Sequence, residues 1–123
     1  MEAKKKLILI LEDEKPLARA LELKLVHEGF EVKNLPNGEN ILSEIQKSHF
    51  SLIVSDLMMP VVDGFQVLQI LKDNKIKIPV IVLTNLSQSE DEKRVRELGA
   101  MDFLVKSDTP ISGVIEKIKQ IVK

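Results

Sequence analysis

The sequence predicts an α/β fold in which a five-stranded parallel sheet is covered by helices. Longer segments with helical periodicity separate the apolar runs that would form its strands. Such alternation is typical of a parallel sheet, because each return of the chain to the same edge requires a crossover helix. The five expected strands are Leu7–Leu11, Phe30–Asn34, Leu52–Ser55, Val80–Thr84 and Phe103–Val105.

The first helix has clear start and stop signals. Leu17, Leu21 and Leu25 recur at four-residue spacing and predict a buried stripe. Pro16 falls in the opening turn, where its missing N–H is harmless, and Gly29 lies where a left-handed C-cap is expected. The helix is therefore expected to end just before Gly29.

The last two helices are expected to differ in how firmly they pack. The final helix should begin with Thr109 as cap and Pro110 as first position. Its apolar stripe is expected to comprise Ile111, Ile115, Ile118 and Val122. The segment 88–98 has only Val95 and Leu98 as clearly apolar residues, so it should form the least firmly packed helix.

Composition restricts the class of protein. The 123 residues are predicted to form one domain, 1–123, without linker or repeat, and the notable absence of an added effector region favours a stand-alone module. The net charge of −1 argues against direct nucleic-acid binding, and the lack of cysteine excludes disulfide or thiolate chemistry. The opening apolar run stops at Glu12 and Asp13, too early for a signal peptide or membrane span. A cytoplasmic location is expected.

The segment SDLMMPVVDGF is the most informative motif. Asp56 ends an apolar strand, and Pro60, Asp63 and Gly64 form the turn after it. Four further polar residues also follow or end predicted strands: Glu12, Asp13, Thr84 and Lys106. Ligands of open parallel sheets bind beyond the carboxyl ends of the strands, so these side chains are expected to form one site.

The clustering of carboxylates predicts a divalent cation. Two unit charges 4 Å apart repel by about 4 kcal/mol at an effective dielectric of 20. Oxygen ligands suit Mg²⁺ or Mn²⁺, with Asp13 and Asp56 as direct ligands and Glu12 acting through water. Zinc is disfavoured because His27 and His49 do not lie at strand ends.

The same residues predict phosphoryl chemistry. The carboxylate of Asp56 can attack a phosphoryl group, while Lys106 neutralises charge on its oxygens and Thr84 donates its hydroxyl. Taken singly, Thr84 is an ordinary strand residue and Lys106 an ordinary solvated charge. Their combination with the acidic cluster favours the phosphoacceptor interpretation.

These motifs make the chain similar to a response-regulator receiver domain of the CheY-like superfamily of two-component signalling. The matching segments are LEDE, SDLMMPVVDGF, PVIVLTN and GAMDFLVKS. The resemblance implies a doubly wound sheet with strand order 2-1-3-4-5. It also implies a histidine kinase or histidine phosphotransfer protein as donor, and the backbone carbonyl of Met58 as a metal ligand.

The resemblance further implies a conformational switch. Phosphorylation would draw Thr84 toward the phosphate and let Phe103 turn inward, which changes the face built from the last two helices. Phe103 could instead be ordinary core. Many relatives dimerise through that face, so a homodimer is an open possibility.

The chain departs from the family at two places. Ser107 stands where Pro commonly follows the strand-end Lys, and we expect a trans Lys106–Ser107 bond because a cis bond before a non-proline residue costs about 3 kcal/mol. Met58 and Leu86 offer no polar side chain to orient an attacking water, which predicts a long-lived phosphoryl group.

Three alternatives compete with this interpretation. A haloacid-dehalogenase-like phosphatase would need a DxD pattern after the first strand, which LEDEKP lacks. A flavodoxin-like carrier would place a flavin phosphate against Glu12 and Asp13, and Trp and Tyr are absent. A receiver-like module that binds its partner without phosphorylation remains open. No chemistry on a small-molecule substrate is expected, so the chain is predicted not to be an enzyme.

Overall fold

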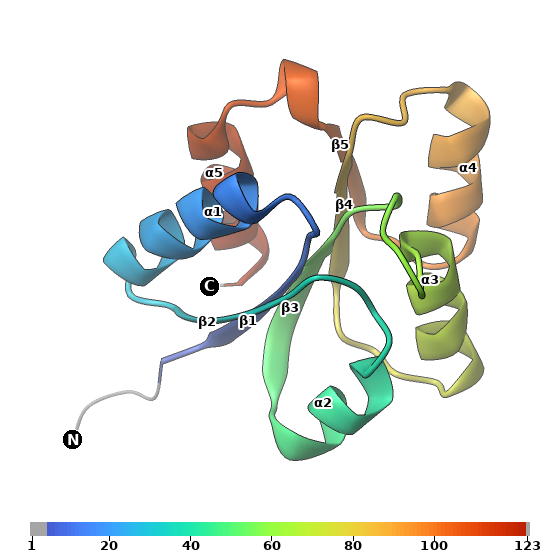
Figure 1. Cartoon of the computed structure of the whole chain (residues 1–123), viewed down its shortest axis with the longest axis horizontal. Coiled ribbons are helices and arrows are strands. Elements are labelled where there is room, and N and C mark those ends of the chain that lie inside the picture. Colours follow the sequence, from blue (N-terminus) through green and yellow to red (C-terminus); the bar gives the residue numbers. More distant parts are fainter. Residues whose placement is uncertain (1–4, 123) are drawn as a thin grey trace.

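The computed structural model describes residues 5–122, in which five strands alternate with five α-helices (Figure 1). The strands are β1 (Leu7–Leu11), β2 (Glu31–Leu35), β3 (Phe50–Ser55), β4 (Val80–Thr84) and β5 (Asp102–Val105). The helices are α1 (Lys15–His27), α2 (Ile41–Lys47), α3 (Gly64–Asp73), α4 (Ser89–Glu97) and α5 (Ile111–Ile121), and a 3₁₀ turn, η1 (Lys106–Asp108), follows β5. All neighbouring strands run parallel in the order β2-β1-β3-β4-β5, so the predicted doubly wound topology is confirmed.

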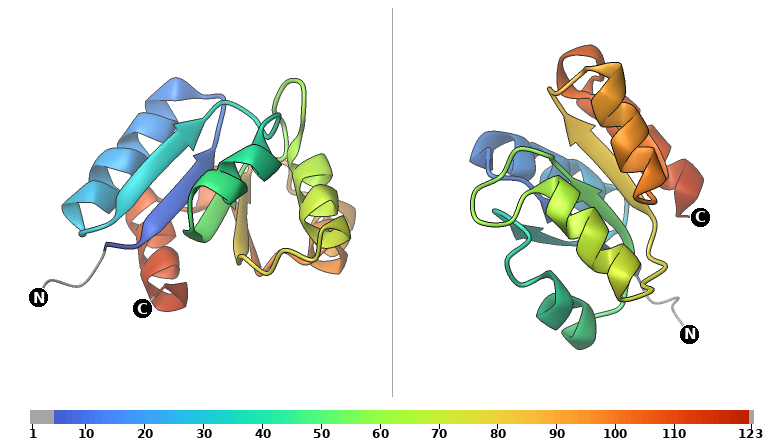
Figure 2. Two further views of the ribbon diagram at one scale, coloured as in Figure 1. Left: turned by 90° about the horizontal axis from the view of Figure 1, so that it is seen from below. Right: turned by 90° about the vertical axis from the view of Figure 1, so that its right-hand side faces the viewer.

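The sheet divides the molecule into two apolar layers. Helices α1 and α5 cover one face, and α2, α3 and α4 cover the other (Figures 1 and 2). Alternate residues of a strand point to opposite faces, so Ile8 and Ile10 of β1 pack toward α1 and α5, whereas Leu9 and Leu11 pack toward the other three helices. Both faces are therefore buried, which explains why the strands are continuously apolar.

Strand register aligns the ends of the strands at one edge. Leu11 pairs with Ser55, and Thr84 pairs with Val105. The residues that follow β1, β3, β4 and β5 consequently emerge side by side at the carboxyl edge of the sheet, while the strand starts define the amino edge. This alignment converts widely separated segments of sequence into neighbours.

Several predicted boundaries required small corrections. Strand β3 begins at Phe50 instead of Leu52, because the β1–β3 register shifts by one residue and the buried Phe50 pairs with Leu7. Strand β2 is displaced by one residue, to Glu31–Leu35. The predicted stop of α1 is confirmed by Gly29, which has φ +95°.

Helix α5 begins one residue later than predicted. Pro110 is its N-cap and Ile111 its first residue, so Thr109 lies one position before the cap. Val114 is buried, whereas Ile111 at the expected stripe is only half-buried. Ile111 falls in the first turn, at the margin of the helix contact with the sheet.

Helix α4 buries few apolar residues, which is consistent with its sequence. Val95 is its only buried residue within the described chain. On its outer side, the guanidinium of Arg94 lies 4.1 Å from the ring centre of Phe65 on α3, a cation–π contact that ties the two helices. No helix among residues 5–122 is long and apolar enough to cross a membrane.

Candidate phosphoacceptor site

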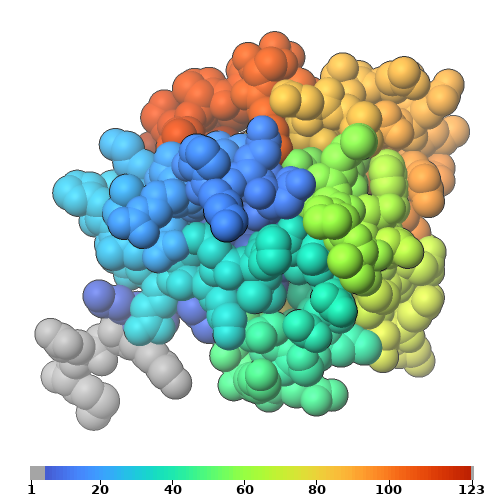
Figure 3. All heavy atoms as spheres, in the orientation of Figure 1, coloured from blue at the N-terminus to red at the C-terminus, as the bar shows by residue number. Residues whose placement is uncertain are grey.

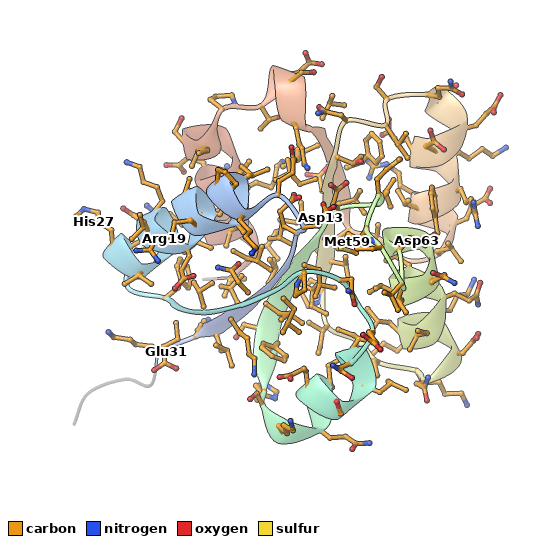
Figure 4. The ribbon with its side chains drawn as sticks, in the orientation of Figure 1. Asp13, Arg19, His27, Glu31, Met59 and Asp63 are labelled. Atoms are coloured by element: carbon orange, nitrogen blue, oxygen red, sulfur yellow. The ribbon has the colours of Figure 1, made fainter. Side chains whose placement is uncertain are left out.

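Three carboxylates meet at the carboxyl edge of the sheet. Oxygen atoms of Glu12, Asp13 and Asp56 all lie within 4.8 Å of one another, the one such acidic or histidine group in the part of the chain that the structure describes. Glu12 and Asp56 are buried, whereas Asp13 is exposed. In Figure 4, Asp13 lies beside Met59 of the β3–α3 loop and far from His27 at the end of α1. The two predicted direct ligands and their predicted water-linked neighbour are therefore adjacent.

Lys106 supplies the positive charge of this cluster. Its Nζ lies 2.7 Å from Oδ2 of Asp56, 2.9 Å from Oε1 of Glu12 and 2.5 Å from Oε2 of Glu14. The Lys106 side chain is 11% exposed, so solvent screens these contacts only partly. One ammonium thus serves several carboxylates that would otherwise repel one another.

The pKa values of Glu12 and Lys106 reflect this crowding of charges. Burial raises the pKa of Glu12, and hydrogen bonds from Lys106 and from the backbone N–H of Glu14 offset the effect only partly. For Lys106, burial favours the neutral amine, but hydrogen bonds to Asp56, Glu14 and Glu12 outweigh it and raise the pKa of the ammonium. Lys106 is therefore charged at any physiological pH.

The backbone after β3 fixes the Asp56 carboxylate. Its Oδ1 accepts hydrogen bonds from the N–H of Leu57 (2.6 Å) and, more weakly, from that of Met58 (3.3 Å). The other oxygen, Oδ2, is the one that faces Lys106. A Cβ on Gly64 would lie 2.2 Å from the carbonyl oxygen of Asp56, so only glycine allows this close return of the chain.

The loop between β3 and α3 is anchored at its end and strained in its middle. Asp63 caps α3 in a reciprocal capping box with Gln66, with bonds of 2.8 and 2.9 Å. The N–H of Val62 donates to the carbonyl of Pro60 at 2.7 Å across Val61, whose φ is +67°. A β-branched residue rarely adopts this conformation, which marks Val61 as a strained position.

Thr84 and the loops beside it complete the site. Thr84 is fully buried, and its Oγ1 accepts a hydrogen bond from the N–H of Leu86 at 3.3 Å. The N–H of Ser107 donates to Oδ1 of Asn85 at 3.1 Å and so joins the loops after β4 and β5. The peptide bonds of the described chain are all trans, which confirms the expectation for Lys106–Ser107.

A surface hollow of about 350 Å³ gives access to these groups. Figure 3 shows the beginning of α1 and the β3–α3 loop meeting at the surface nearby. The hollow is lined by Asp13, Glu14, Asp56, Met58, Thr84, Asn85, Leu86 and Lys106. Every predicted site residue lines the hollow except Glu12 and Phe103. Glu12 is buried beneath it but belongs to the same acidic cluster, whereas Phe103 lies half-buried against the α2–α4 layer.

Two participants were missed by sequence reasoning. Glu14 and Asn85 both line the hollow and contact the Lys106–Ser107 segment. Each directly follows a residue that was predicted to belong to the site, Asp13 and Thr84. Adjacency to the motif was therefore the available signal.

Comparison with known proteins agrees with the fold and the site. Residues 8–118 match the family model of the response regulator receiver domain. A probable transcriptional regulator, ycf27, of Cyanophora paradoxa is 42% identical over 110 residues, which cover 89% of this chain and 46% of that protein. The response regulator ArlR of Staphylococcus aureus is 33% identical, covering 94% and 52%. The chain thus spans about half the length of these curated relatives.

Solved structures of receiver domains have the same fold as this chain. A receiver domain of the Francisella response regulator 1452 superimposes with a TM-score of 0.88 at 28% identity, covering 96% of this chain and 97% of that one. A receiver domain of a signal transduction histidine kinase from Syntrophus aciditrophicus gives 0.84 at 32% identity, covering 95% and 89%. With its doubly wound sheet and acidic cluster at the carboxyl edge, the chain belongs to the response regulator receiver domain family.

Proposed function

We propose that this receiver domain accepts a phosphoryl group on Asp56 from a histidine kinase or a histidine phosphotransfer protein, and signals by a change of conformation. The single observation that carries the proposal is the position of the Asp56 carboxylate. It opens onto a hollow, lies within hydrogen-bonding distance of the Lys106 ammonium, and is flanked by two further carboxylates.

The donor set fits a bound Mg²⁺ or Mn²⁺. The three clustered carboxylates carry more negative charge than the Lys106 ammonium compensates, since it contacts Glu12 and Asp56. Asp13 and Asp56 would bind the ion directly, Glu12 would act through water, and the backbone carbonyl of Met58 would complete the set. When bound, the ion would neutralise charge on the phosphoryl oxygens.

The transfer needs one nucleophile and one leaving group. An oxygen of Asp56 would form a bond to phosphorus as the bond between phosphorus and the donor imidazole nitrogen breaks. That nitrogen would leave with the electron pair and take a proton from solvent. Lys106 would neutralise charge on the transferred group, and the Thr84 hydroxyl would donate a hydrogen bond to it. The modified group would therefore be the chain's own Asp56.

Partners would recognise the phosphorylated state through a change at β4 and β5 that reaches the α4–β5–α5 surface. Thr84 would exchange its present bond with the Leu86 N–H for one to the phosphate. Movement of that loop would make room for Phe103, which is half-buried against the core. The resulting population shift would alter the α4–β5–α5 surface, where a downstream protein or a second copy of the chain would bind.

Intact-mass spectrometry after incubation with acetyl phosphate and Mg²⁺ tests the proposal. The wild type should gain the mass of one phosphoryl group, whereas Asp56→Asn and a metal-chelated sample should gain none. Incorporation into Asp56→Asn would assign the acceptor elsewhere. A wild type that stays unmodified with both acetyl phosphate and a phosphohistidine donor would favour the alternative, a module that binds without phosphorylation.

A further inference from the structure

We propose that Glu14 is the partner that Lys106 gives up when Asp56 is phosphorylated. Glu14 would be a positioning residue that holds the ammonium in the resting state and releases it to the phosphoryl group. This inference rests on the proposed function of Asp56 and adds a residue that the acidic motif did not predict.

The ammonium of Lys106 is fully occupied in the resting state. It has three N–H donors, and its Nζ contacts three carboxylates, those of Asp56, Glu12 and Glu14. A phosphoryl oxygen is a further acceptor. Binding it through Lys106 therefore requires one of the present contacts to break.

Exposure identifies the contact that breaks most easily. The Glu12 side chain is 4% exposed, so loss of Lys106 would leave a buried carboxylate without its cation. The side chain of Glu14 is 57% exposed, and water can replace the ammonium there. Asp56 is itself the modified group. Of the three contacts, the one between Lys106 and Glu14 therefore costs the least free energy to break.

The local backbone allows this release. The N–H of Glu14 donates to Oε2 of Glu12 at 3.0 Å, and its carbonyl accepts from the N–H of Ala18 at 3.0 Å. Glu14 is the N-cap of α1, yet its side chain makes no capping hydrogen bond. The main chain is thus fixed on both sides, while the side chain can swing away without disturbing the helix.

A pair of variants separates exchange from simple repulsion of an incoming anion. Glu14→Asp keeps the negative charge but shortens the side chain by one methylene, so its carboxylate no longer reaches Lys106. Glu14→Gln removes the charge. If Glu14 competes for Lys106, both variants should bind beryllofluoride, a phosphoryl mimic, more tightly in the presence of Mg²⁺. We expect roughly a two- to fivefold gain, the range of an exposed ion pair.

Affinity is measured from the backbone amide resonances of Leu57 and Met58, which bond to Asp56 in the resting state. Mg²⁺ affinity is titrated separately and should be the same for Glu14→Asp as for the wild type. In a Lys106→Met background, Glu14→Asp should have no effect on beryllofluoride affinity. Glu116→Gln, on the exposed side of α5, controls for the change in net charge.

Three outcomes would overturn the inference. A gain in Glu14→Gln alone would mean repulsion instead of exchange, and no gain in either variant would mean that Glu14 does not compete. A gain that persists without Lys106 would place the effect elsewhere. In all three, the wild type still binds beryllofluoride and is phosphorylated, so the proposed function survives; a wild type that does neither would remove both.

Discussion

The two ends of β5 carry opposite charge clusters. At the carboxyl edge, one cation, Lys106, lies among carboxylates that include the buried Glu12 and Asp56. At the amino edge, one carboxylate, Asp102, lies between two cations, Arg96 of α4 at 3.4 Å and Lys117 of α5 at 3.1 Å. Both clusters join elements that are distant in sequence, but only the first is buried.

This difference separates a site from a surface ion pair. The Asp102 side chain is 21% exposed, and its partners Arg96 and Lys117 are more exposed. The two cations and nearby solvent therefore balance the negative charge of Asp102. The Lys106 cluster has more negative than positive charge in a place that water reaches poorly. An arrangement that is electrostatically unfavourable in isolation is expected where a cation or a phosphoryl group is meant to bind.

Removal of Lys106 should have the largest effect on stability. Lys106→Met leaves Glu12 and Asp56 buried without a cation, so we expect the free energy of unfolding to fall by about 3 kcal/mol in metal-free buffer. Mg²⁺ should restore part of this loss. Urea unfolding followed by far-UV circular dichroism measures both, with Lys24→Met on exposed α1 as control. Equal effects of the two variants would mean that burial of the carboxylates is not the cause.

The apolar rim of the hollow should control the lifetime of the phosphoryl group. The Met58 side chain is exposed beside Asp56, and Leu86 lines the same hollow, so neither can orient water for attack. Replacing both, as Met58→Asn with Leu86→Gln, should accelerate loss of the phosphoryl group on the order of tenfold. The decay is followed by intact-mass spectrometry, with Met101→Asn at the amino edge as control. An unchanged decay would disprove the prediction of a long-lived state.

Relief of backbone strain at the carboxyl edge should stabilise the fold. Val61 holds φ at +67°, which glycine adopts without a Cβ clash. Strain relief of 1–3 kcal/mol is partly offset by the greater freedom of glycine in the unfolded chain. We expect Val61→Gly to raise the free energy of unfolding by about 1 kcal/mol in urea titrations. Val62→Gly should instead be destabilising, and a stabilising effect there would point to a cause other than φ.

Loss of the Asp102 carboxylate at the amino edge should have the smallest effect on the free energy of unfolding. Burial opposes the charge of Asp102, but hydrogen bonds from the Phe103 N–H and Lys117, aided by Arg96, lower its pKa overall. A lowered pKa in the folded state contributes stability that is present above the unfolded value of about 3.9 and is lost as pH falls through the folded value.

We therefore expect Asp102→Asn to cost less than about 1 kcal/mol at pH 7. The difference from the wild type should shrink below pH 4 and at high salt. Urea unfolding across pH and salt measures it. A difference that persists at low pH would show that hydrogen bonding, and not charge, maintains the β5 end.

The periodic features of the sequence predicted most of the fold. Apolar runs set all five strands within two residues, and parallel pairing then aligned Glu12, Asp56, Thr84 and Lys106 at one edge. The start of β3 at Phe50 was missed because it depends on a register shift between β1 and β3, which is a property of strand pairing.

Contacts between loops were harder to predict than the loops themselves. The direction of Lys106 depends on the 3₁₀ turn η1 and on the Ser107–Asn85 hydrogen bond, neither of which has a sequence signal. Glu14 consequently could not be distinguished from an ordinary acidic residue at a helix start. The positive φ of Val61 was equally hidden, since valine is the wrong residue for such a turn.

The Lys106–Glu14 contact joins residues 92 positions apart. During synthesis, the acidic cluster leaves the ribosome long before Lys106, which follows β5 and neutralises part of its charge. A chain that has made β3 but not yet β5 would expose Asp56 without the ammonium that assists transfer. Competence to receive a phosphoryl group would thus arise only when β5 docks, so a phosphorylated molecule would also be one whose five-stranded sheet is complete.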